Sequence, residues 1–109
     1  MSHHIERMNK IIMHELSSIL LLDSKNPLLK FVSITKVSLT NDLSLATVWY
    51  SVIGKETEID ATKKALEDSR GFLRSELSRR IEIRKTPDLK FKYDESLEYG
   101  KHIEELLNK

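Results

Sequence analysis

The chain has 109 residues, and its 18 lysines and arginines against 17 aspartates and glutamates give a net charge of +1 with neutral histidines. This length suits one domain with a single core, and 39% hydrophobic with 32% charged residues is typical of a globular protein rather than a disordered tail. The lack of cysteine excludes disulfides, thiolate metal sites and cysteine nucleophiles, and it fits a reducing compartment.

We find no targeting or membrane segment in the sequence. The longest strongly apolar run, residues 16–22, contains two serines and is far shorter than the ~20 residues of a membrane span. The N-terminus carries two histidines and Glu6 instead of a basic region followed by an apolar one. We therefore expect a cytoplasmic protein that has no membrane partner.

Residues 3–22 are predicted to form an amphipathic helix, because their apolar side chains recur at three- and four-residue spacing. Two β-rich runs follow, at residues 31–39 and 45–53, and a loop around Asp42 joins them into a hairpin. The apolar positions of the helix are Ile5, Met8, Ile12, Leu16, Ile19 and Leu20.

The first strand changes phase, because Val32 and Ile34 have one parity and Val37 and Leu39 have the other. If all four residues face the core, a β-bulge lies near Thr35 and Lys36. The second strand alternates without interruption and directs Trp49 to the opposite face from its core residues, which are Ala46, Val48, Tyr50 and Val52.

After Gly54 the chain is predicted to become helical again. This helix contains Ala61, Ala65 and Leu66 and runs into Gly71, and a second helix follows at residues 72–81, with Leu73, Leu77 and Ile81 as its buried stripe. Residues 89–93 alternate strictly and predict a third strand, with Leu89, Phe91 and Tyr93 in the core. Ser96 can cap a last helix with Leu97, Ile103, Leu106 and Leu107.

The predicted order is therefore α–β–β–α–α–β–α. It indicates an α+β two-layer sandwich, in which a three-stranded sheet is covered by helices on one face. The other face can stay wet, because antiparallel pairing tolerates one solvated side. Without a repeat or linker, we expect one domain over residues 1–109, with a tail after about residue 107 that can be disordered.

Positive charge is concentrated in one segment. Residues 70–92 hold eight basic and three acidic side chains, a net charge of +5, whereas the rest of the chain has a net charge of −4. Within this segment, a run of only fifteen residues (70–84) holds five of the six arginines. Guanidinium is the preferred group for bidentate contact with phosphate. The pattern favours a face that binds a polyanion, although a solvated helix face would give the same counts.

Gly71 lies within this basic segment, and a glycine inside a helix costs about 1 kcal/mol relative to alanine. The structural interpretation is a C-cap that lets one helix end and another begin. The functional interpretation adds that glycine lets a phosphate approach the backbone and the N–H groups of the next helix. The two are compatible, and the arginines favour the second. The predicted RNA-binding residues are Ser69, Arg70, Gly71, Arg74, Ser75, Ser78, Arg79, Arg80, Arg84, Lys85, Lys90 and Lys92.

Several motifs spread over almost the whole chain resemble one family. They include Arg7-Met8-Asn9, residues 32–37 followed by Asp42-Leu43, residues 71–74, and Arg84 followed by Pro87-x-Leu89-x-Phe91 and Asp94, which is the most specific. The order of elements resembles a type II KH domain, and the motifs resemble the ribosome-binding factor A family. In place of the Gly-x-x-Gly loop with which KH domains hold a nucleic-acid backbone, the resemblance implies a helix–kink–helix. The family's Ala-x-Gly kink reads Ser69-Arg70-Gly71 here.

The resemblance also implies a role. The protein would be a ribosome assembly factor, without enzymatic activity, that binds the immature small ribosomal subunit through its ribosomal RNA. It would assist rRNA processing and maturation and matter most in the cold, as a cold-shock function. We expect it to act as a monomer.

An alternative is a protein-interaction module of the same shape, which docks an acidic partner through the basic face. RNA binding would weaken more steeply with salt than such docking. We predict no cofactor and no metal site, because none of the four histidines has a helical i, i+4 partner with a helper carboxylate. For Trp49, packing across the strand pair is favoured over stacking on a base.

Overall fold

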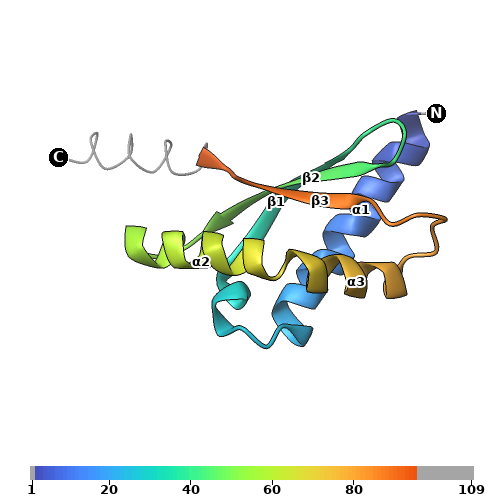
Figure 1. Cartoon of the computed structure of the whole chain (residues 1–109). Helices are drawn as coiled ribbons and strands as arrows, with labels where there is room; N and C mark the ends of the chain where they lie inside the picture. Colours follow the sequence, from blue (N-terminus) through green and yellow to red (C-terminus); the bar gives the residue numbers. More distant parts are fainter. Residues whose placement is uncertain (1, 96–109) are drawn as a thin grey trace.

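The computed structural model describes residues 2–95, and these form an α+β sandwich with a three-stranded sheet (Figure 1). The α–β–β–α–α–β order predicted from the sequence is confirmed, and the last predicted helix, after Ser96, lies outside the described residues. No helix among residues 2–95 is long and apolar enough to cross a membrane. In chain order the elements are α1 (Ser2–Ser18), η1 (Ile19–Asp23), η2 (Pro27–Phe31), β1 (Val32–Leu39), β2 (Leu45–Val52), α2 (Glu56–Asp68), α3 (Arg70–Arg80) and β3 (Asp88–Tyr93).

The strands are arranged in the order β1-β2-β3, with β2 in the centre. β1 pairs with β2 in antiparallel orientation, whereas β3 pairs with β2 in parallel. The assumption of a purely antiparallel sheet is therefore wrong for β3. Parallel neighbours need a crossover of a dozen or more residues, and here α2 and α3 supply it beneath the sheet (Figure 1).

The sheet has one apolar face, and the strand register defines it. Val37 pairs with Val48, which pairs with Phe91, and the next row is Leu39, Ala46 and Leu89. The bulge predicted in β1 is confirmed: the register shifts between Ile34 and Lys36, which makes Thr35 the extra residue. The Thr35 hydroxyl donates to Asp94 Oδ2 at 2.7 Å and so ties the bulge to the end of β3.

The helices cover this apolar face with the side chains that the spacing predicted. Ile12, Leu16 and Ile19 of the first helical segment are buried, as are Leu66 of α2 and Leu73 and Leu77 of α3. Tyr50 joins the layer through edge-to-face contacts with Phe91 and Tyr93, with ring centroids 6.4 and 5.7 Å away, and burial raises its pKa to about 12.

The helix predicted over residues 3–22 is helical throughout, but its last turn, η1, is π-helical. The short helix η2 was not predicted; it starts at Pro27, where the Asn26 side chain accepts the N–H of Leu28 at 3.0 Å. η2 buries Leu29 and delays the first strand by one residue, so that Phe31 is exposed instead of paired. The second strand also ends one residue early, which leaves Ile53 exposed.

The loop between β1 and β2 is organised by Asp42, in agreement with the turn predicted there. Asp42 Oδ1 accepts the Thr40 hydroxyl at 2.7 Å, the Ser44 hydroxyl at 2.8 Å and the Ser44 N–H at 3.1 Å. Leu43 then takes a left-handed conformation, with φ of 64°, and packs against the core. Hydrogen bonds lower the pKa of Asp42 to about 2; the bond from Thr40 has the largest effect, followed by those from Ser44.

This shift predicts a pH dependence of stability. The pKa of Asp42 is lower in the folded chain than its ordinary value of 3.8, so the carboxylate stabilises the fold above about pH 4. That contribution fades as the pH falls from about 4 to about 2. The carboxyl ¹³C shift of Asp42, followed by NMR, should titrate near pH 2. The stability difference between the native chain and Asp42→Asn should shrink over the same range. A midpoint near 3.8 would contradict the prediction.

Candidate RNA interface

The junction between α2 and α3 is a break at Ser69. Ser69 has φ of −95° and ψ of 1°, which lies outside the helical region, and its N–H bonds to the Ala65 carbonyl at 3.0 Å. Its own carbonyl accepts the N–H of Leu73 at 2.9 Å, so α3 begins at once after the break. From the sequence we predicted that α2 ends at Gly71, and this was wrong by about two residues, because α2 ends at Asp68.

Gly71 lies in the first turn of α3, where it does not adopt the left-handed conformation that favours glycine. A Cβ atom added at this position would have no neighbour within 4 Å. Gly71 is therefore required neither for the bend nor by crowding, and the predicted reason for its presence is corrected. What glycine gives here is open space at the surface of the first turn of α3.

Arg74 has a structural role. Its Nη2 donates to the Thr86 carbonyl at 2.8 Å, and its Nε donates to the Pro87 carbonyl at 3.3 Å and lies 3.3 Å from Asp88 Oδ1. These contacts fasten α3 to the loop before β3, where Pro87 is buried. A guanidinium with these partners is largely committed to the fold.

The other arginines of α3 differ in their availability to a ligand. The Arg80 side chain is only 28% exposed and joins α3 to α1, because its Nη1 lies 3.3 Å from Glu15 Oε2 and 3.4 Å from the Ser18 hydroxyl. Arg70 and Arg79 pair near the surface with Glu67 and Glu76, at 3.6 and 3.4 Å; both guanidinium groups are exposed, whereas the Glu76 side chain is 21% exposed. Exposed pairs of this kind contribute about 0–1 kcal/mol, so a phosphate can replace either carboxylate.

Ser75 and Ser78 are exposed on the same helix, and the Ser78 hydroxyl donates to the Ser75 carbonyl at 2.6 Å. Arg84 and Lys85 follow α3 in the loop to β3, and both are exposed. Within residues 2–95, neither makes an ion pair in the structure. Both side chains are therefore accessible to a ligand.

Lys90 and Lys92 lie on a different surface. Leu89 is buried under the helices, and Phe91 is partly buried there, so the alternate residues of β3 point to the wet face of the sheet. The structure therefore separates the predicted residues. Ser69, Arg70, Gly71, Ser75, Ser78, Arg79, Arg84 and Lys85 border the helix pair and its loop, and this set is called the helix-pair surface below.

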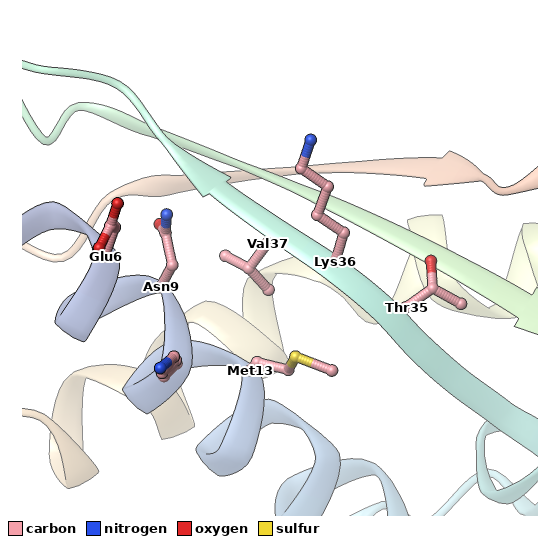
Figure 2. A pocket seen from close by; sticks show the side chains of 7 residues that line it. Glu6, Asn9, Met13, Thr35, Lys36 and Val37 are labelled. Atoms are coloured by element: carbon pink, nitrogen blue, oxygen red, sulfur yellow. The ribbon is translucent and has the colours of Figure 1, made fainter. Parts of the chain in front are cut away.

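A shallow groove of about 300 Å³ runs between α1 and β1, away from these residues (Figure 2). Met13 and Val37 point into the space between the two elements, whereas the Lys36 side chain extends away from α1. Asn9, beside the groove, accepts the N–H of Leu39 at 2.9 Å and so satisfies part of the outer edge of β1. The groove was not predicted, because it needs the packing of two elements far apart in sequence.

Comparisons with known proteins agree on one family. A family model described as ribosome-binding factor A matches residues 4–107. The ribosome-binding factor A of Macrococcus caseolyticus is 45% identical over 107 residues, which cover 98% of this chain and 94% of that relative. The crystal structure of ribosome-binding factor A from Thermus thermophilus has a similar fold, with a TM-score of 0.71 and 21% identity over 82% of this chain and 94% of that one.

A further similar fold is a homology model of the Thermus thermophilus protein, fitted into the cryo-EM map of its 30S complex. Its TM-score is 0.67 and its identity 22%, over 80% of this chain and 91% of that one. At these identities, the two structures show the likeness of the fold alone.

The contacts of Arg74 and Arg79 predict different effects on stability. Arg74→Met should lower the free energy of unfolding by about 1–2 kcal/mol, because it leaves two carbonyls and a carboxylate without their donor. Arg79→Met should change it by less than about 0.5 kcal/mol, because its guanidinium is exposed and makes a single ion pair near the surface. Urea denaturation of both variants measures the difference. Equal effects would show that the loop is not held by Arg74.

Proposed function

Because the chain belongs to the ribosome-binding factor A family, we propose that it binds the small ribosomal subunit through its ribosomal RNA. The match of the family model across residues 4–107 is the observation that carries the proposal. The similar Thermus thermophilus protein, fitted into the map of its 30S complex, supports the choice of this subunit.

The proposed role follows from that partner. The protein binds immature small subunits, assists the processing and maturation of their rRNA, and leaves as they mature. Its effect is greatest in the cold, when misfolded RNA rearranges slowly. We place it in the cytoplasm, as a monomer that acts by binding and not by catalysis.

The helix-pair surface is the part of the chain that we assign to this rRNA. It offers exposed guanidinium groups at Arg70, Arg79 and Arg84, the ammonium of Lys85, and the open approach to the start of α3 beside Gly71. Phosphate contacts of this type give affinity and orientation without reading a base sequence. Arg74 and Arg80 support the surface by holding α3 to the loop and to α1, so they contribute mainly through folding.

The first test is co-sedimentation of the purified chain with isolated small subunits, from about 50 mM to about 200 mM salt. Arg84→Glu/Lys85→Glu should weaken binding about tenfold or more, since it reverses two cations that make no ion pair within residues 2–95. The matched control is Lys25→Glu/Lys55→Glu, which makes the same change of charge at exposed sites away from that loop. Circular dichroism confirms that both variants fold.

Binding that is lost in the first variant and kept in the control would support the assignment. Equal binding by both would remove the loop from the interface. Binding that does not respond to salt would favour docking on a ribosomal protein, and no binding at any salt would overturn the proposed function.

Gly71→Ala separates stability from binding. The residue is helical and the space around it is open, so alanine should raise the free energy of unfolding by about 0.5 kcal/mol. If an RNA backbone occupies that space, the added methyl should weaken subunit binding by about 1 kcal/mol, a roughly fivefold loss. Ser75→Ala, on the same helix, is the control. A more stable variant that binds normally would exclude close approach of RNA at Gly71.

A further inference from the structure

The wet face of the sheet carries a regular arrangement of cations around one aromatic ring. Trp49, in the central strand, pairs with Lys36 of β1 on one side and with Lys92 of β3 on the other. The next row on the same face consists of Ser38, Thr47 and Lys90. Directly paired residues have Cβ atoms about 5 Å apart, so each row is a continuous strip of side chains across three strands.

These side chains belong to the face that the helices leave open. Their neighbours Val37 and Val48 are buried, and the alternation along each strand directs Lys36, Trp49 and Lys92 to the opposite side. Lys36, Lys90 and Lys92 are exposed, and Trp49 is partly exposed. The extension of Lys36 away from α1 can be followed in Figure 2.

Trp49 is not held in place by the hydrophobic core. The indole lies outside the core cluster and outside the partly buried residues that pack against it. Its ring lies under the ammonium of Lys36, 5.0 Å from Nζ to the centroid. A cation–π contact at an exposed site is weaker than the stacking of a base on an aromatic ring, so a base can displace this ammonium.

The charges on this face favour an anionic partner. The two rows contain three lysines and no carboxylate. Asp88, at one end of the face, lies beside Arg74, and Asp94, at the other end, accepts the Thr35 hydroxyl. An aromatic ring bordered by cations binds single-stranded nucleic acid, because the ring stacks on a base and the cations contact the phosphates on either side.

We infer that the open face of the sheet is a second RNA-binding surface, which holds a single-stranded segment with one base on Trp49 and the flanking phosphates on Lys36, Lys90 and Lys92. The inference rests on the proposed function for its partner, but its residues lie on the side of the sheet away from the helices. A duplex is excluded as the ligand, because its bases are stacked on one another and cannot reach the ring.

The test uses Trp49 as its own probe, since it is the single tryptophan of the chain. The purified full chain is titrated with single-stranded oligoadenylate of about ten nucleotides, and in parallel with an RNA duplex of the same length. The expected result is quenching of the tryptophan emission by the single strand and none by the duplex. Unchanged emission at saturating single strand would overturn the inference.

Variants of the face provide the second measurement, which is the anisotropy of a labelled strand. Trp49→Leu should weaken binding about tenfold or more, whereas Trp49→Phe should keep most of it. Lys90→Gln/Lys92→Gln should reduce the slope of log affinity against log salt by about 1.4, since each phosphate contributes about 0.7. The change at Trp49 leaves the core intact, so folding is expected to persist. Binding by Trp49→Leu equal to that of the native chain would overturn the inference.

Arg84→Glu/Lys85→Glu separates this inference from the proposed function. The tryptophan emission of this variant should be quenched by single-stranded oligoadenylate as in the native chain, although the variant binds small subunits poorly. A native chain that binds subunits but shows no quenching would overturn the second surface and leave the proposed function intact. Quenching without any binding to subunits would overturn the proposed function and support the sheet surface.

Discussion

A three-stranded sheet with helices on one side has a single apolar layer to bury, and the strand register decides which side chains enter it. The rows that face the helices consist of apolar and aromatic side chains, as in Leu39, Ala46 and Leu89 and in Val37, Val48 and Phe91. The bulge at Thr35 is needed because β1 changes parity, and without it a one-residue slip would turn Val37 and Leu39 towards water. The same register fixes what the opposite face presents to a partner.

Properties with a local period could be predicted from the sequence, whereas properties set by distant contacts could not. The apolar stripes of the helices, the parity of each strand and the bulge all follow from the spacing of neighbouring residues. The parallel pairing of β3 does not, because it depends on the path of the chain through α2 and α3. The break at Ser69 was displaced to Gly71 because glycine is the usual sign of a helix end, and here the serine carries the non-helical dihedrals.

At the candidate site, too, local patterns could be predicted and contacts between distant residues could not. Composition and clustering predicted a basic segment, but they gave every cation equal weight. The folded chain distinguishes them: Arg74 and Arg80 hold elements together, Arg70 and Arg79 form pairs that are easily exchanged, and Arg84 and Lys85 are exposed. No sequence pattern could identify the partners of Arg74, because the carbonyls of Thr86 and Pro87 reach it only after the loop has folded. Trp49 was left out of the predicted site because packing across the strand pair was favoured over stacking on a base, and the lysines beside it become visible only when the strands are paired.

The separation of the cations into two surfaces has a consequence for how such a chain can work on RNA. The helix-pair surface offers charge and an open helix start, features that suit the backbone of a folded RNA. The face around Trp49 offers stacking, which is available only to a base that has left its helix. If both proposals hold, the chain would stay on a structured part of the subunit while it holds a strand that has not yet paired. With both surfaces in contact, the slopes of log affinity against log salt would sum, and the affinity would exceed that of either surface alone.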